Sequence, residues 1–407
     1  MLPYSFSRVS HVAAWITAAC SIQAAIPVVP IYSEDPVDGF NATEMVDHPT
    51  LGRLSAGQMR RKVLQAAADY VGSLFDPSYD GEQIRITVAM VPLDPDFVGF
   101  GGPSEFQSGF GSSNPKYQAN LSYPAALANH LAERNLVTGA HADLQLNLNY
   151  PQWDYGIAVG HEEGKDSFYT TSVHEVLHGM GFLSGVGENG AFDPGPTPMD
   201  GLLVVGQTQR TRWTSLSNEA RKAAVVGEDL FLAGPLSMEW NPLDPGQPAR
   251  VNAPSTYSSG SSTSHWDPNT WNPFGLMMLP SASPDVPEKV YLVAMERGFF
   301  YDMGYTPALP RISISFSAGK TQVQFKSIQG AHYVLRATSS LPSAGVDGWM
   351  DLTPATQATG NSLTFVDSSG GATARFYHVE EVADPLAAIR PTMGIRPATL
   401  GRVHPKR

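Results

Sequence analysis

Residues 171–182 read TSVHEVLHGMGF and contain two histidines, His174 and His178, four positions apart. On an α-helix, residues four apart lie on one face with their side chains about 5–6 Å from each other. Two imidazoles so placed can bind one Zn²⁺, and Glu175 then stands near the water that the metal would activate. The opposite flank of this helix carries apolar residues at helical spacing, which predicts burial in a core: Val173, Val176, Leu177 and Met180.

The residues around this motif predict where the helix begins and ends. A hydroxyl of Thr170, Thr171 or Ser172 is expected to cap the first turn, because it can accept a hydrogen bond from a backbone N–H. Gly179 and Gly181 predict an abrupt end, since glycine accepts the left-handed conformation that stops a helix. The alternative is an amphipathic helix whose histidines are merely polar surface residues.

The composition is that of a folded protein. The 407 residues include 42% hydrophobic and 16% charged residues, so the chain is neither disordered nor embedded in a membrane throughout. Its 38 glycines and 33 prolines favour many turns and irregular connections over a helical bundle. The formal net charge of −12 argues against nucleic acid as a partner. We expect a monomer without a membrane span.

The first 24 residues have the composition of a secretory signal peptide. Arg8 is the only early charge, residues 12–22 are apolar and small, and Ala24 ends a candidate cleavage site. We therefore expect a secreted, periplasmic or cell-surface protein; the alternative is a short buried helix. Cys20 is the only cysteine, so the exported chain is expected to contain no disulfide. Lipidation at Cys20 is a second interpretation of this segment.

The chain after residue 24 divides into four parts. Residues 25–55 are rich in proline and polar residues, which indicates a linker or pro-segment. Residues 56–306 carry helix and strand patterns together with the histidine motif. Residues 311–382 carry short alternating strands separated by turn residues, as in a small antiparallel β-sandwich. Residues 383–407 hold five Lys or Arg against one acid and are predicted to be a disordered basic tail.

Periodicity within residues 56–306 predicts further elements around the histidine motif. Apolar residues at helical spacing indicate helices, strict alternation indicates half-buried strands, and a glycine-rich run indicates a loop. The predicted helices are 56–74, 123–136, 216–226 and 287–303, the predicted strands are 83–92, 142–149 and 198–204, and the predicted loop is 94–115.

A catalytic zinc needs three protein ligands and one open position for water, so the two histidines require a third partner. Six residues after His178, where the compact form of the motif has its third ligand, stands Ser184, which is a poor zinc ligand. His265 is the only histidine that follows the helix within the same predicted domain, and a serine-rich arm precedes it. Asp200 and Glu219 are the alternatives, since spacing alone cannot place a distant ligand.

The order HEVLHGMGF, then His-Trp-Asp at 265–267, then Gly-Leu-Met-Met at 275–278, resembles the metzincin metallopeptidases, in particular their leishmanolysin-like branch. The resemblance covers roughly residues 83–305 and implies an α+β catalytic domain with a mixed twisted sheet and an active-site helix. It implies a zinc-dependent endopeptidase that acts on protein or peptide substrates. It also implies that Gly181 turns the chain away from the helix.

The resemblance assigns a role to each residue of the site. His174, His178 and His265 would be the zinc ligands, and Glu175 the general base. Met277, or as a second choice Met278, would be the methionine of the turn beneath the metal. Residues 142–149 resemble the edge strand of such enzymes, and residues 296–304 their closing helix.

Two functions of other classes compete with peptide hydrolysis. The first is a catalytically inactive, zinc-stabilised binding or adhesion protein outside the cell, against which the intact Glu175 argues because such a protein needs no base. The second is a carbohydrate- or surface-binding protein, in which Trp349, Tyr333 and Tyr377 would form a binding face on the C-terminal domain. Such aromatic residues more often belong to the core of a sandwich, which is the interpretation we favour.

Overall fold

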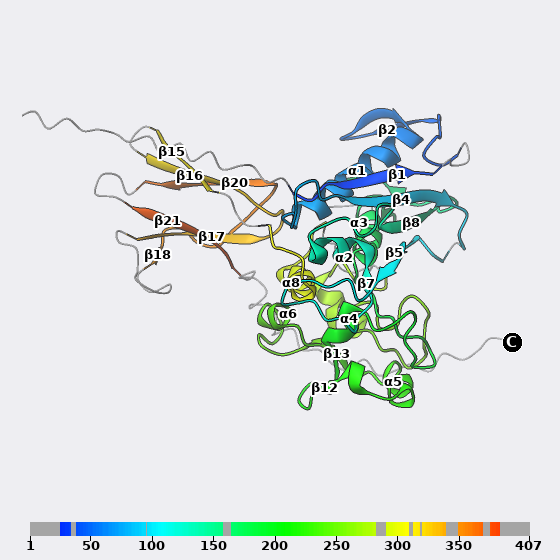
Figure 1. Ribbon diagram of the computed structural model, residues 1–407. Helices are drawn as coiled ribbons and strands as arrows, with labels where there is room; N and C mark the ends of the chain where they lie inside the picture. Colours follow the sequence, from blue (N-terminus) through cyan, green and yellow to red (C-terminus); the bar gives the residue numbers. More distant parts are fainter. Residues whose placement is uncertain are drawn as a thin grey trace, which may run out of the picture.

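The computed structural model describes residues 25–33, 38–94, 96–157, 164–281, 290–308, 312–317, 320–338, 349–368 and 375–382. Figure 1 shows a larger part built of helices and a mixed sheet, joined to a C-terminal region of antiparallel strands. The chain is therefore an α+β protein, as the sequence predicts. The predicted signal peptide (1–24), with Cys20, and the predicted tail (383–407) lie outside the described residues.

The main sheet has four strands, of which three are parallel and the last is antiparallel to its neighbour. In the second strand, residues 84–91, every other side chain faces the core. The buried side chains are Ile84, Ile86, Val88 and Met90, and their neighbours are partly exposed. The order across the sheet is β1 (Val28–Tyr32), β4 (Ile84–Val91), β8 (Ala142–Asn147) and β5 (Gly99–Pro103).

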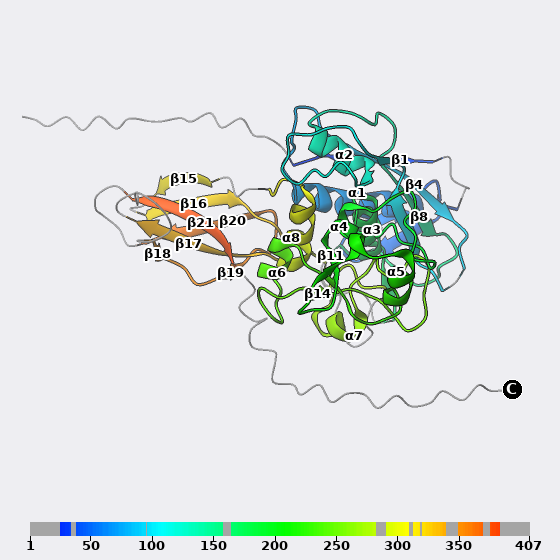
Figure 2. The same ribbon diagram turned by 60° about the horizontal axis from the view of Figure 1, so that its bottom comes forward.

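Two helices pack together beside this sheet. The first, α1 (Ala56–Ser73), begins with a capping box in which Ser55 and Gln58 each accept a hydrogen bond from the other's backbone N–H. The second, α3 (Phe168–Gly179), carries the histidine motif and contacts α1, β8 and β5. The strand β5 therefore lies against the helix that bears the site. Figure 2 shows α1 and α3 beside the strands β4 and β8.

Three predictions about this part need correction. The predicted loop 94–115 contains β5 and the short strand β6 (Phe106–Gln107), which a glycine-rich sequence without alternation does not reveal. Residues 142–147 form an interior strand, and the edge strand next to it is β5. Within residues 25–55, β1 joins the main sheet, so this piece is not a linker.

The remaining elements before the histidine motif are short. A hairpin of two strands precedes α1, and a strand leads into a helix between β6 and β8. Two further short strands lie just before α3. These elements are β2 (Met45–His48), β3 (Gly52–Ser55), β7 (Tyr123–Pro124), α2 (Ala125–Ala132), β9 (Trp153–Asp154) and β10 (Asp166–Ser167).

The segment after α3 folds into short elements around a four-stranded sheet. Most of the stretch predicted as strand 198–204 is a helix, because Thr197 and Asp200 form a capping box at its start. The elements are α4 (Pro198–Leu202), β11 (Leu203–Val205), β12 (Thr211–Arg212), η1 (Trp213–Ser215), α5 (Asn218–Ala224), β13 (Leu230–Leu232), α6 (Pro235–Glu239), β14 (Ala249–Arg250), α7 (Pro268–Trp271) and η2 (Asn272–Phe274).

The last helix of this part, α8 (Ala294–Met303), is shorter than the predicted helix 287–303. Residues 290–293 are not helical, and 287–289 lie outside the described residues. Earlier in the chain, the predicted helix 216–226 corresponds to the shorter helix α5. No described helix is long and apolar enough to cross a membrane.

The C-terminal region consists of two antiparallel sheets. One has the order β15 (Ile312–Ser317), β16 (Lys320–Lys326) and β20 (Ser362–Asp367). In the other, β17 (His332–Thr338) pairs with β18 (Met350–Asp351), β19 (Thr356–Gln357) and β21 (Phe376–Val382). The ring of Phe325 on β16 contacts the ring of Tyr333 on β17, and Tyr333 is almost completely buried. Tyr333 is therefore a core residue and cannot belong to the binding face considered from the sequence.

Candidate metal centre

The helix α3 begins one turn earlier than its sequence suggests. Ser167 is the N-cap, and its side-chain oxygen accepts a hydrogen bond from the backbone N–H of Thr170, 3.1 Å away. Thr170, Thr171 and Ser172, the predicted caps, lie inside the helix, where the Ser172 hydroxyl donates to the carbonyl of Phe168. The prediction fails because four hydroxyl residues in the range 167–172 can all cap a helix, and only tertiary contacts select one.

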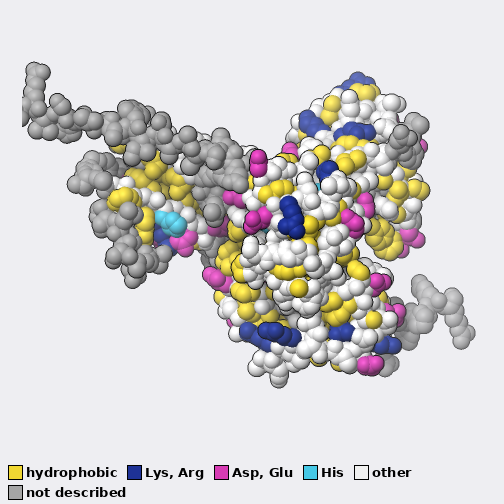
Figure 3. Space-filling model, in the orientation of Figure 1, with side chains coloured by type: hydrophobic (Ala, Val, Ile, Leu, Met, Phe, Trp, Pro, Cys, Tyr) yellow, Lys and Arg dark blue, Asp and Glu magenta, His cyan; other side chains and the backbone are white. Residues whose placement is uncertain are grey.

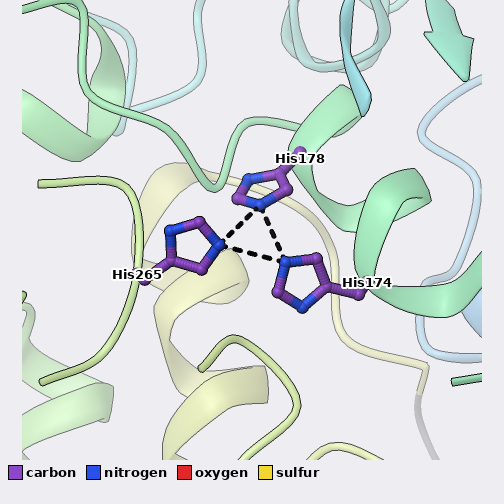
Figure 4. Close-up of side chains that lie close together, drawn as sticks. All are labelled: His174, His178 and His265. Atoms are coloured by element: carbon purple, nitrogen blue, oxygen red, sulfur yellow. Dashed lines mark hydrogen bonds between the residues drawn. The ribbon is translucent and has the colours of Figure 1, made fainter. Parts of the chain in front are cut away.

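Three imidazoles meet in the structure, two from α3 and one from the segment before α7 (Figure 4). The Nε2 atoms of His174 and His178 are 3.0 Å apart, and that of His265 lies 3.1 Å from the first and 3.2 Å from the second. His178 and His265 are buried, and His174 lines a cleft. The distant histidine chosen from the sequence therefore does lie beside the pair on the helix.

Backbone carbonyls fix the tautomer of each ring. The Nδ1 atom of His174 lies 2.7 Å from the carbonyl of Met277, that of His178 lies 2.6 Å from the carbonyl of Phe182, and that of His265 lies 3.1 Å from the carbonyl of Ser261. A carbonyl can only accept, so each Nδ1 carries the proton and donates it. In the neutral rings, all three Nε2 atoms therefore point lone pairs at a common centre.

This arrangement fits a zinc ion. A tetrahedral site with Zn–N bonds of 2.0–2.1 Å separates its nitrogens by about 3.3 Å, close to the distances between these Nε2 atoms. Three lone pairs this close repel one another unless a cation lies between them. Burial lowers the pKa of His174 to about 4 and that of His265 to about 3, and it lowers the pKa of His178 as well, so the rings are neutral at pH 7.

Glu175 is buried beside the three imidazoles and lines the same cleft. Burial raises the pKa of its carboxyl to about 8, although a hydrogen bond from the backbone N–H of Gly101 opposes the shift. Gly101 belongs to β5, and a Cβ atom there would lie only 2.2 Å from the carbonyl oxygen of Glu175. Glycine at this position thus lets the edge strand reach the helix.

The cleft beside the imidazoles has a volume of about 420 Å³. On one side it is lined by β5 and the residues just before it, including the exposed rings of Phe97 and Phe100, whose centroids are 5.0 Å apart. The serine-rich arm 257–262 and residues 275–277 line other parts of the wall. The cleft is therefore open to a ligand that lies along the edge strand.

The two methionines of the predicted turn have different surroundings. Met277 lines the cleft and provides the carbonyl that accepts from His174. Met278 is fully buried, and its backbone carbonyl accepts from the N–H of Trp266, 2.9 Å away. The contacts thus favour Met277 over Met278 as the residue next to the centre, although its assigned role stays a prediction.

The two alternative ligands do not belong to the cluster. Among the described residues, His174, His178 and His265 form the one group of metal-ligating side chains with that geometry. Glu219 is exposed on α5. Asp200 is buried, but its carboxylate accepts hydrogen bonds from Ser184 Oγ at 2.5 Å and from the Trp213 indole N–H at 3.0 Å.

Ser184 and Asp200 therefore hold the chain that leaves α3 instead of binding a metal. Asp200 also accepts from the backbone N–H groups of Gly185 and Thr197, both at 2.8 Å. Before this segment, the chain turns at Gly181, whose φ of +119° favours glycine. The turn brings the carbonyl of Phe182 to the ring of His178, which agrees with the predicted role of Gly181.

Sequence reasoning missed the groups that orient the ligands. The three acceptors are backbone carbonyls, which leave no mark in a sequence, and Gly101 was part of a predicted loop. Glu296 could have been found as an acidic residue near the start of a helix, but its partners come from two distant segments. A comparison of the chain with protein-family models and with curated proteins finds no match.

Proposed function

We propose that this protein is an exported zinc-dependent endopeptidase with a metzincin-like catalytic part. The observation that carries this proposal is the convergence of three Nε2 lone pairs on one point beside a buried carboxyl group, in a cleft open to a ligand. His174, His178 and His265 would hold the zinc ion, and Met277 would form the floor of the site. A site with three protein ligands keeps one position open, as a catalytic zinc requires.

Zinc bound by three imidazoles would supply Lewis acidity, which polarises a carbonyl oxygen and makes water easier to deprotonate. Glu175 would take the proton of the attacking water and return it to the nitrogen of the leaving amine. A base works best when its pKa is near the working pH, and burial raises the pKa of Glu175 toward that range. The Gly101 N–H holds the carboxylate toward the edge strand.

The substrate would be a protein segment in extended conformation. The strand β5 has β8 on one side and no further strand on the other among the described residues, and three of its residues line the cleft. A peptide can add to such a free edge through backbone hydrogen bonds. On the face shown in Figure 3, Lys and Arg lie in small separate groups, which with the negative net charge favours a protein substrate over nucleic acid.

The test is casein hydrolysis by the purified protein with and without a chelator, together with metal analysis. We expect about one zinc per chain and chelator-sensitive cleavage. Glu175→Gln should keep the zinc and lose turnover by at least about 100-fold, because only the proton transfer is removed. If wild-type protein binds zinc but cleaves no peptide bond in an unfolded substrate, the result supports the alternative hypothesis of a catalytically inactive binding protein.

A further inference from the structure

Glu296 is a fully buried carboxylate on α8 that does not belong to the cluster of His174, His178 and His265. Its Oε1 atom accepts two hydrogen bonds, one from the indole N–H of Trp266 at 3.2 Å and one from the backbone N–H of Met278 at 3.0 Å. Its Oε2 atom accepts from the backbone N–H of Val293 at 3.1 Å, at the start of the same helix. One side chain thus joins three segments of the chain.

Two of these segments determine the position of imidazoles. Trp266 directly follows His265, and Met278 directly follows Met277, whose carbonyl accepts from Nδ1 of His174. The segments also bond to each other, because the Trp266 N–H donates to the Met278 carbonyl at 2.9 Å. The Glu296 carboxylate completes this ring of hydrogen bonds. Its partners Trp266 and Met278 are each one residue away from a group of the centre, the first from His265 and the second from the Met277 carbonyl.

We propose that Glu296 is a positioning residue of the metal centre, which sets the distance between His265 and His174. His178 lies outside this linkage, since the carbonyl of Phe182 orients its ring. This inference rests on the metal centre of the proposed function and is independent of peptide hydrolysis. Groups that orient metal ligands in this way typically change metal affinity by 10–100-fold when they are replaced.

A carboxylate suits this position because Trp266, Met278 and Val293 all present N–H donors to it. An amide of the same size would turn its NH₂ group toward at least one of these donors, and a buried donor without an acceptor is costly. Glu296→Gln therefore keeps the volume of the side chain, while its NH₂ group opposes either the Val293 N–H or the N–H groups of Trp266 and Met278, which loosens the anchor of this ring on α8. The expected result is that zinc affinity falls by about 10–100-fold.

Asp302 provides a matched control on the same helix. It is also buried, and its carboxylate accepts from the backbone N–H groups of Leu236 and Ser237, at 3.0 and 2.9 Å, and from the Ser237 hydroxyl. These partners belong to α6 and its start, and none of them adjoins a metal ligand. Asp302→Asn should therefore lower stability without changing zinc affinity by more than about threefold.

The experiment measures zinc affinity of the full chain by competition with a chromophoric chelator, and the visible spectrum of the cobalt-substituted protein. Glu296→Gln should weaken binding and change the cobalt bands, while Asp302→Asn should leave both unchanged. The proposal is overturned if the two variants lose affinity equally, or if neither does. Urea unfolding of both variants checks whether their losses of stability are comparable.

Trp266→Phe is the second variant, for the case in which Glu296→Gln does not fold. It removes one N–H donor and keeps an aromatic ring in the core. A fall in zinc affinity with altered cobalt bands supports the linkage, and unchanged values contradict it. If wild-type protein binds zinc without cleaving casein, the peptidase proposal fails while this inference still stands.

Discussion

The protein itself fixes the position of each imidazole of the centre at two points. Its Nδ1 donates to a backbone carbonyl, and its Cβ is fixed by α3 or by the segment before α7. The rings therefore lose little conformational freedom when an ion binds, which favours tight binding. The same burial that aligns the rings also keeps them neutral, because it disfavours the protonated form.

The lowered pKa values predict how zinc binding depends on pH. A histidine whose pKa is lowered from 6.5 in the folded protein makes its full contribution to the free energy of unfolding above pH 6.5. This contribution is lost as the pH falls toward the folded-state pKa, which is about 4 for His174 and about 3 for His265. In the folded protein, protons therefore compete with zinc only near and below pH 4. We expect zinc affinity, measured by equilibrium dialysis, to stay nearly constant from pH 7 to about 5. A steep loss that begins near pH 6.5 would contradict this.

The sequence specified the ligand types but not the groups that orient them. His174 and His178 follow from helical spacing, and His265 follows from the lack of another histidine downstream in the same predicted domain. The acceptors of their Nδ1 protons are main-chain atoms of residues 182, 261 and 277, whose positions depend on turns and on distant packing. No side-chain pattern encodes such contacts, so only the folded chain reveals them.

At the scale of the elements, the contact between β5 and α3 sets the shape of the cleft. The helix, the interior strands and the short α5 were predictable, because their apolar residues repeat at regular spacing. The edge strand was not predictable, since glycines at 99, 101 and 102 give it no alternation. Its position results from packing against Glu175 and from pairing with β8.

Gly101→Ala tests this contact, and Gly102→Ala is its control. An added Cβ at 101 would lie 2.2 Å from the Glu175 carbonyl oxygen, so the strand or the helix must move, whereas a Cβ at 102 would meet nothing within 4 Å. We expect Gly101→Ala to lower kcat/KM on casein by about 10-fold or more, because the displaced strand carries the backbone N–H of residue 101 away from the Glu175 carboxylate. Gly102→Ala should stay within about twofold of wild type. Equal rates for the two variants would show that close packing of β5 on α3 does not matter for activity.

At the scale of the whole molecule, α8 connects the metal centre to the C-terminal strands (Figure 1). Glu296 binds the segments that carry the ligands, and the next residue, Arg297, is buried and pairs with Glu381 on β21. Tyr291, just before the helix, accepts a hydrogen bond from Gln357 on β19 at 2.9 Å. The buried apolar residues of both regions belong to one continuous core. The C-terminal strands are thus attached to the element that supports the site.

Glu381→Gln tests how much this attachment contributes to stability. Removing one partner of a fully buried ion pair costs about 3–5 kcal/mol, but the Glu381 side chain is 21% exposed, so we expect a loss nearer about 2 kcal/mol in the free energy of unfolding. The loss arises because the Arg297 charge stays buried while its partner becomes neutral. Urea unfolding followed by tryptophan fluorescence measures it.

Asp351→Asn is the control within the same region. Asp351 pairs with Arg336 at 2.8 Å, but its side chain is 60% exposed, so water screens the pair and its loss should cost less than about 1 kcal/mol. A larger effect of Glu381→Gln than of Asp351→Asn would locate the contribution at the junction between α8 and β21. If both variants unfold at the wild-type urea concentration, the Arg297–Glu381 pair does not stabilise the junction, and the apolar core alone joins the C-terminal strands to the helix behind the metal centre.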